Sequence, residues 1–265
     1  MIETDLCRNV VNRHVLRIKQ LFKWATQNEL LPPSAYHGLQ AVTGLRKGRT
    51  EVRESTPVRP VPDEHVDAAR PHVSRQVWAM IELQRLTGMR SGEVVLMRGR
   101  DLDTTGSIWL YRPESHKTEH HGHERMVELG PRAQASLGPF LKTDVDSVLF
   151  SPRDSAAEQR IERRRKRKSK VQPSQQDRTK QNPKRKPGDR YTADSYRRAI
   201  ARACELAKVP HWHPHQLRHN YATRIRKEFG VEAARILLGH RSTAVTELYA
   251  EIDRGRVRDF VAKVG

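Results

Sequence analysis

Hydrophobic residues recur at helical spacing in the first part of the chain. Val11, Val15, Ile18 and Leu21 lie three to four positions apart among charged and polar residues. This pattern predicts an amphipathic helix that ends before the LLPPS segment. One apolar stripe needs other helices to cover it, and about fifty residues are too few for a complete bundle. Residues 1–48 are therefore predicted to form part of a helical domain.

A second patterned region covers residues 62–265. PDEHVDAAR and SRQVWAMIELQRLTG have helical periodicity, SIWLYRP and ERMVELG alternate as short strands do, and helical patterns return from Thr192 onward. Residues 49–61 hold charges, Thr, Ser and Pro without periodicity, which predicts a linker. The predicted fold class is α+β and mostly α, with a small helical segment before the linker.

The end of the chain has short helical patterns. VEAARILLGH predicts an apolar helix that stops at the glycine before His240, and STAVTELYAEID predicts the next helix. RVRDFVAKVG predicts a small terminal helix. A side chain at the break between the first two helices can project into a cleft.

The charge of the chain favours a polyanionic partner. It has 50 Lys and Arg against 31 Asp and Glu, a net charge of +19. Residues 160–190 contain fourteen of the basic residues and three acids, so this segment alone carries +11. It has almost no apolar residues, so burial cannot offset its ordering entropy. The stretch at about 153–190 is therefore predicted to be a disordered basic insertion.

The centre of this insertion is predicted to bind DNA. Its basic run consists of Arg163, Arg164, Arg165, Lys166, Arg167 and Lys168. Contacts from such residues to DNA phosphates add nonspecific affinity and steep salt dependence. A solvated linker without DNA contact is the alternative.

Four segments carry residues suited to phosphoryl transfer. They are LTGMRSGE with Arg90, HPHQLRH with His215 and Arg218, LLGHRS with His240, and ELYAE with Tyr249. Phosphoryl transfer needs an oxygen nucleophile, positive charge around the nonbridging oxygens and a proton donor for the leaving alkoxide. Guanidinium groups stay charged and match two phosphate oxygens with a planar fork, so the two arginines are candidates for phosphate binding.

A tyrosine nucleophile needs help at neutral pH. The ordinary pKa is about 10, so forming the phenolate of Tyr249 costs roughly 4 kcal/mol. Neighbouring arginines and a base reduce this cost. His215 precedes Arg218 by three residues in a predicted helix, so the two side chains can meet one phosphate. Together these residues could cut a DNA strand without a metal.

The order of these motifs closely resembles the tyrosine recombinase (phage integrase) family from about residue 87 to residue 253. The resemblance implies that residues 62–265 have the catalytic fold shared with type IB topoisomerases. It also implies that residues 1–48 are the second half of a DNA-embracing core-binding domain. Such proteins recombine double-stranded DNA at specific sites through a 3′-phosphotyrosine intermediate, without a cofactor, as tetramers on paired sites.

The resemblance also assigns roles to residues. Tyr249 is the nucleophile, His215 accepts its proton, Arg90 and Arg218 hold the phosphate, and His240 donates to it. Two further residues complete the set. Lys117, on a hairpin between the predicted strands, matches the leaving-group acid, although the histidines around it leave the register open. Glu93 matches the acidic position that holds Arg90 in place.

Other functions stay open. The chain could be a truncated or decayed relative that binds DNA without cutting it, or a topoisomerase that relaxes supercoils by the same cleavage. A fragment, a natural short form and a decayed copy are equally compatible with the short first domain. A zinc site is a further alternative, from the residues His211, His213, His215 and His219. The two cysteines are far apart and HExxH is absent, so no metal is expected.

The start of the sequence lacks a secretory core, and no apolar run is long enough to cross a bilayer. The expected location is cytoplasmic and nucleoid-associated in a bacterium, or phage-derived. The expected partners are double-stranded DNA and further copies of the chain, with no membrane and no small-molecule substrate.

Overall fold

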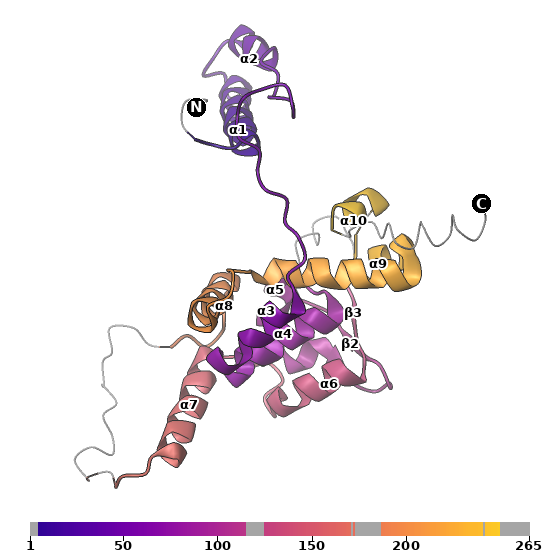
Figure 1. The fold of residues 1–265 in the computed structure, drawn as a ribbon. Helices are drawn as coiled ribbons and strands as arrows, with labels where there is room; N and C mark the ends of the chain where they lie inside the picture. The colour runs from indigo at the N-terminus through magenta and orange to yellow at the C-terminus, as the bar shows by residue number, and fades with distance from the viewer. Residues whose placement is uncertain (1–4, 115–124, 171, 173–186, 241, 250–265) are drawn as a thin grey trace, which may run out of the picture. The chain divides into compact units, whose positions relative to one another are not determined.

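The computed structural model describes residues 5–114, 125–170, 172, 187–240 and 242–249. Its elements in chain order (Figure 1) are α1 (Arg8–Gln27), α2 (Pro33–Gln40), α3 (Asp63–Ala68), η1 (Arg70–His72), α4 (Arg75–Thr87), α5 (Ser91–Leu96), η2 (Gly99–Asp101), β1 (Leu102–Asp103), β2 (Trp109–Tyr111), β3 (Val127–Leu129), α6 (Pro131–Leu137), η4 (Gly138–Phe140), α7 (Pro152–Lys166), α8 (Ala193–Ala207), α9 (Pro214–Leu238) and α10 (Thr243–Tyr249). The chain divides into two compact units, residues 1–58 and 59–265. None of the described helices is long and apolar enough to cross a membrane.

The first unit pairs α1 with α2. The predicted amphipathic helix is confirmed as α1, with Val11 buried, while Leu21 and Trp24 are more than half exposed. The segment after α2 folds back onto α1, where the Asn12 side chain accepts a hydrogen bond from the backbone N–H of Leu45 (2.8 Å) and donates to its carbonyl (3.0 Å). Within this unit, two helices leave part of the α1 apolar stripe uncovered.

The second unit contains a small antiparallel sheet of order β1-β2-β3. The two predicted strands are confirmed as β2 and β3, with Tyr111 paired to Val127. The two-residue strand β1, where Leu102 pairs with Tyr111, was not predicted because it is too short to show alternation. Buried Tyr111 donates its hydroxyl to the carbonyl of Glu93 (2.7 Å), so the sheet fixes the position of α5.

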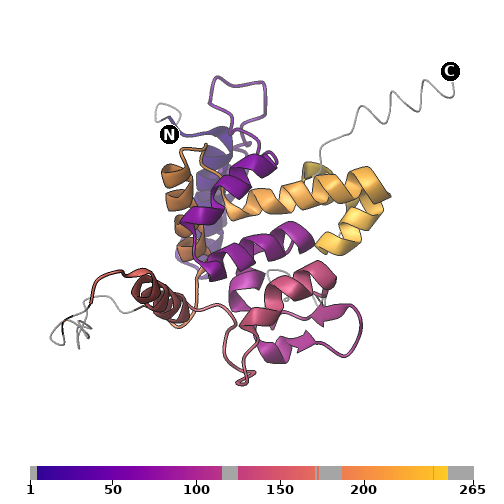
Figure 2. The ribbon, with the colours of Figure 1, turned by 60° about the horizontal axis from the view of Figure 1, so that its bottom comes forward.

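Helix α4 is the centre of the second unit. Ser74 caps its start by accepting a hydrogen bond from the N–H of Val77 (3.2 Å), and Gly88 caps its end in the left-handed conformation (φ 65°). Its buried residues include Met80 and Ile81. Figure 2 shows α4 between α9 and α6, and both helices contact it. This central position makes the C-terminal end of α4 part of the interior.

The second half of the unit is built on α9. This helix spans 25 residues with one non-helical position, Gly230 (φ 91°), and ends at Gly239 (φ 63°). The predicted break before His240 is therefore confirmed, and α10 packs against α9 after it. The predicted helix in RVRDFVAKVG lies outside the described residues.

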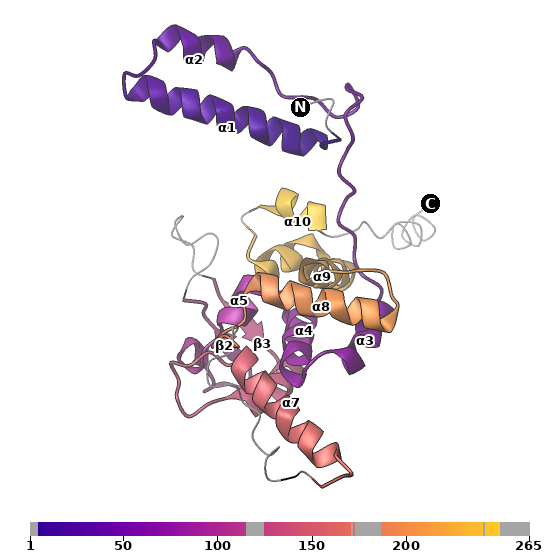
Figure 3. The same cartoon turned by 90° about the vertical axis from the view of Figure 1, so that its left-hand side faces the viewer.

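The basic insertion begins as a helix, so its prediction as disordered chain is wrong over its first part. Ser151 caps α7 by accepting from two backbone N–H groups, Pro152 occupies the first turn, and Glu162 pairs with Lys166 (3.2 Å). Figures 1 and 3 show α7 projecting away from the rest of its unit. The N–H of Arg153 donates to the carbonyl of Gly188 (3.2 Å), so the two ends of the insertion meet. Residues 171 and 173–186 lie outside the described part.

Candidate active site

Arg90 lies in the sharp connection between α4 and α5. The left-handed turn at Gly88 directs the chain away from α4, and an added Cβ there would overlap the ring of Tyr221. Arg90 then precedes α5, and its backbone N–H donates to Glu93 Oε2 (2.8 Å) while its Nη1 donates to Oε1 (2.7 Å). One carboxylate therefore fixes both the backbone and the side chain of Arg90.

Glu93 is buried and carries a negative charge in this environment. Burial alone would raise its pKa, but Arg125, the N–H of Arg90 and the Arg90 guanidinium together hold the pKa below its ordinary value. Removing this carboxylate would leave two guanidinium groups without their shared anion. The sequence-based prediction that Glu93 holds Arg90 agrees with these contacts.

Arg218 joins the two halves of the second unit. Its side chain is almost fully buried (1% exposed) on α9. Nη1 donates to the carbonyl of Gly88 (2.7 Å) and Nη2 to the carbonyl of Leu238 (2.6 Å). These carbonyls belong to the end of α4 and the end of α9, so Arg218 holds together the turns that carry Arg90 and His240.

His240 follows the left-handed turn at Gly239. Its Nε2 lies 2.9 Å from Arg218 Nη2, and its Nδ1 lies 3.0 Å from the hydroxyl of Thr246 on α10. Because arginine can only donate, Nε2 must accept, which places the imidazole proton on Nδ1. Burial, together with the positive charges of Arg218, Arg90 and Arg125 and the neighbouring His215, lowers the pKa of His240 to about 3. The ring is therefore neutral at pH 7.

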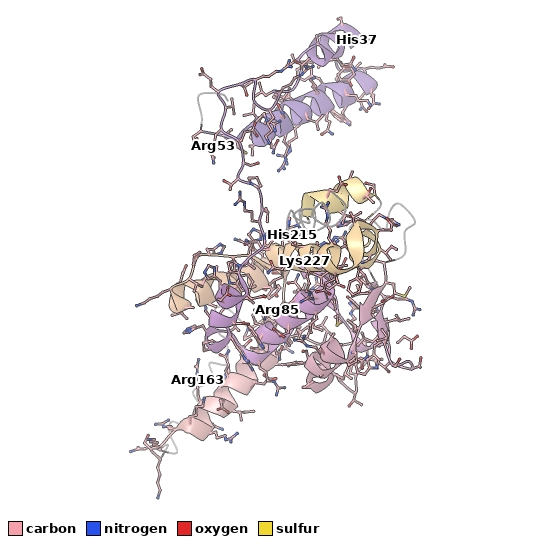
Figure 4. All side chains as sticks on the ribbon, turned by 45° about the vertical axis from the view of Figure 1, so that its right-hand side comes forward. His37, Arg53, Arg85, Arg163, His215 and Lys227 are labelled. Carbon is pink, nitrogen blue, oxygen red and sulfur yellow. The ribbon has the colours of Figure 1, made fainter. Side chains whose placement is uncertain are left out.

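His215 lies on the first turn of α9 (Figure 4), three residues before Arg218 in the same helix. Its ring packs edge-on against that of His219, with 5.4 Å between centroids. Partial loss of hydration, together with the charges of His219, Arg218, His213 and Arg90, lowers its pKa to about 4. The side chain still has an exposed edge. A neutral imidazole at this edge can accept a proton.

Arg125 is a member of the cluster that the sequence did not reveal. Its side chain is buried just before β3, where Nε lies 3.5 Å from Glu93 Oε1 and Nη1 donates to the carbonyl of Leu237 (3.1 Å). Burial lowers the pKa of its guanidinium, and Glu93 opposes this. In a chain with 50 Lys and Arg, one arginine at the edge of a predicted strand gives no distinct signal.

Two predicted site residues are described only in part or not at all. Tyr249 is the last residue of α10, which packs on α9, and its side chain is outside the described part. Lys117 lies outside the described residues. The structure therefore brings together four predicted residues with Arg125. They are Arg90, Glu93, Arg218 and His240, with His215 beside them on α9.

The basic run is separate from this cluster. Its six residues are all exposed, on the last turn of α7 and directly after it. Figure 4 shows Arg163 on α7, away from His215 on α9. Among the described residues, no three His, Cys, Asp or Glu side chains gather as metal ligands would.

The comparison with protein families shows which family the chain belongs to. The model of the phage integrase family matches residues 66–256, a span that includes every residue of the cluster. The chain belongs to the phage integrase family. This integrase-family chain is 27% identical over 178 residues to the tyrosine recombinase XerC of Yersinia pestis. The aligned region covers 66% of the chain and 47% of the relative. It is 24% identical over 187 residues to XerC of Oceanobacillus iheyensis, 70% of the chain and 52% of the relative. It spans about half the length of these relatives.

Solved structures confirm the predicted fold of this integrase-family chain. A Tn1549 transposon integrase in complex with a circular intermediate DNA superposes with a TM-score of 0.61 at 15% identity, covering 99% of the chain and 81% of that structure. A fragment of lambda integrase, in a dimer bound to a COC′ core site, gives 0.60 at 16% identity, with coverage of 92% and 74%. The fold is the tyrosine recombinase catalytic fold.

Proposed function

We propose that this phage integrase family member is a site-specific DNA recombinase that works through a 3′-phosphotyrosine intermediate. The observation that carries the proposal is the bonding of buried Arg218, which links the Arg90 turn through Gly88 and the His240 turn through Nε2 and Leu238. Segments more than a hundred residues apart thus form one cationic cluster. Membership of the family over residues 66–256 supports the same activity.

The cluster is suited to bind a phosphodiester. Arg90 has 23% of its side chain exposed, so it can contact a phosphate oxygen directly. Arg218 lies beneath the surface, where a fixed positive charge acts in a low dielectric and needs no reorganisation during the reaction. Glu93 balances only one of the guanidinium charges, so the site as a whole attracts an anion.

The proposed reaction transfers one phosphoryl bond at a time. The hydroxyl oxygen of Tyr249 attacks the phosphorus while His215 accepts its proton, and the bond from phosphorus to the 5′ oxygen breaks. Lys117 gives a proton to that oxygen, which leaves as a 5′-hydroxyl. The 5′-hydroxyl of a partner strand then attacks the phosphotyrosine and releases Tyr249. Bond energy is conserved, so the reaction needs no cofactor.

The state of His215 fits the role of a base. Its pKa of about 4 keeps the ring neutral at pH 7, so it can receive the tyrosine proton. A bound phosphate adds negative charge beside the ring and raises this pKa, which strengthens the base when DNA is present.

The proposed partners are double-stranded DNA and further copies of the chain. One active site cuts one strand, and exchange between two duplexes requires four cuts. We therefore expect a tetramer on paired sites. Its size can be measured by light scattering on the protein bound to DNA.

Covalent capture tests the proposed chemistry. The protein is incubated with a library of nicked duplexes of random sequence, denatured with detergent, and the DNA that stays attached is sequenced. The wild-type chain should enrich one sequence, and Tyr249→Phe should retain no DNA because it lacks the nucleophile. Tyr36→Phe removes a tyrosine hydroxyl from the first unit and should still attach.

The alternatives predict other results. Binding without covalent attachment by the wild-type chain would favour the noncatalytic relative. Attachment with relaxation of supercoiled DNA, but without joining of two duplexes, would favour the topoisomerase. Full attachment by Tyr249→Phe would refute the assignment of the nucleophile.

A further inference from the structure

Arg125 contacts Glu93, which holds Arg90, and also the end of α9 at Leu237 and Gly239. We propose that Arg125 is a positioning residue, which holds the Gly239–His240 turn in register with the Arg90 turn through one buried guanidinium. This inference rests on the proposed function, because it assigns a residue to the same site. Three features carry it: the shared carboxylate, the bond to the end of α9, and the contact with Gly239.

The first feature is the carboxylate oxygen that two arginines share. Glu93 Oε1 accepts from Arg90 Nη1 at 2.7 Å and lies 3.5 Å from Arg125 Nε. Glu93 and Arg125 are both almost fully buried. Breaking a buried pair leaves an uncompensated charge, so the geometry of these groups is strongly constrained. Arg125 therefore forms a buried ion pair with the carboxylate that holds Arg90.

The second feature is the bond to the C-terminal end of α9. Arg125 Nη1 donates to the carbonyl of Leu237 at 3.1 Å. This carbonyl is one of the last four of the helix, which have no partner inside it, and a cation there also interacts favourably with the helix dipole. The same side chain that pairs with Glu93 therefore anchors the residues that lead to His240.

The third feature is the close contact with Gly239. A Cβ on this glycine would lie 2.8 Å from Arg125 Nη1 and 3.2 Å from its Cδ. The turn thus rests directly on the Arg125 side chain, and its left-handed conformation (φ 63°) also favours glycine. Arg218 donates to the next residue upstream, Leu238, and to His240 itself. The Gly239–His240 turn is therefore held by two guanidinium groups. Arg125 connects it to Glu93, and Arg218 connects it to the carbonyl of Gly88.

A lysine at position 125 would break this arrangement while keeping the charge. Its ammonium is one point charge, whereas Arg125 reaches Glu93 with Nε and Leu237 with Nη1, at two separate positions of the planar guanidinium. Arg125→Lys should therefore neutralise Glu93 without holding the Gly239–His240 turn. Arg132→Lys, at an exposed position on α6, is the matched control.

Cleavage kinetics test the inference on the duplex recovered by covalent capture. Arg125→Lys should lower the rate of covalent attachment at saturating DNA about tenfold or more, with the DNA dissociation constant within about twofold of wild type. Arg132→Lys should match wild type in both. In the His240→Ala background, Arg125→Lys should have little further effect, because it acts through the turn that carries His240. Equal losses with and without His240 would show a merely structural role and overturn the inference.

A measurement on the free protein separates this inference from the chemistry. Ring ¹⁵N shifts of His240, assigned with His240→Gln, report which nitrogen carries the proton. The wild-type ring should hold the proton on Nδ1, and Arg125→Lys should show a mixture of tautomers as the contact with Arg218 loosens. An unchanged tautomer would overturn the inference even if the chain cuts no DNA. If the wild-type chain forms no covalent complex but the tautomer shifts, the proposed function fails and the positioning role stands.

Discussion

At the scale of single residues, buried charged side chains determine the geometry of this site. Glu93, Arg125 and Arg218 are each almost fully buried, and each bonds to a turn rather than to the middle of a helix. Such groups lose hydration on folding and keep their charge only with well-placed partners. Their contacts therefore specify the positions of the turns. His240 and His215 stay neutral at pH 7 mainly because burial lowers their pKa values, and the charge of Arg218 adds to this effect.

The buried histidine makes stability depend on pH. On folding, the pKa of His240 falls from 6.5 to about 3. Between these two pH values the unfolded chain therefore binds a proton at this histidine that the folded chain does not bind. Its contribution is complete above pH 6.5 and is lost as the pH falls toward 3. Between pH 7 and pH 5, this group should account for roughly 1–2 kcal/mol of lost free energy of unfolding.

Urea unfolding at the two pH values measures this loss. His240→Gln cannot titrate, so its free energy of unfolding should fall less between pH 7 and pH 5 than that of wild type. His72→Gln, at an exposed position, is the matched control and should behave like wild type. An equal pH dependence in His240→Gln and wild type would contradict the assigned pKa.

At the scale of elements, the sequence predicted those helix ends that a single residue determines. The stops of α4 and α9 follow from Gly88 and Gly239, which adopt the left-handed conformation that few other residues tolerate. Helix α7 was missed because its composition suggested disorder, while the cap at Ser151 and the Glu162–Lys166 pair favoured a helix. The order of the site motifs was visible in the sequence. The role of Arg125 was not, because it depends on Glu93 and Leu237, which are far away along the chain.

The exposed end of α7 should contribute to DNA binding through charge. We propose that Arg163, Arg164 and Arg165 bind phosphates, since all three are exposed and α7 projects from its unit. Changing the three to Gln should lower the slope of log affinity against log salt by up to about 0.9 for each phosphate that is no longer neutralised. Filter binding between low and moderate salt gives this slope.

The matched control changes three exposed arginines elsewhere in the same unit to Gln. They are Arg112, Arg132 and Arg202. This control should leave the slope closer to the wild-type value than the α7 variant does. An unchanged slope in the α7 variant, or an equal decrease in both, would favour a solvated helix that does not touch DNA.

At the scale of the whole molecule, the two units differ in how they are stabilised. The main core cluster extends from Val61 to Leu217, and a second cluster from Tyr221 to Leu238, so both lie in the second unit. The candidate active site is also made of residues from this unit. In the first unit, α1 and α2 bury few apolar residues, and Leu16, Leu21 and Trp24 stay more than half exposed.

This difference predicts that residues 59–265 fold without the first unit. Because the apolar clusters and the bonds of Arg218 and Arg125 are internal to this part, the fragment should unfold cooperatively in urea. Its midpoint should lie close to that of the main transition of the full chain. Far-ultraviolet circular dichroism follows the transition, and near-ultraviolet signals from buried Trp212 report its core. The fragment 1–58 should show no cooperative transition alone, since its two helices bury too little apolar surface to offset their ordering entropy. A fragment 59–265 without a cooperative transition would mean that the second unit needs the first to fold.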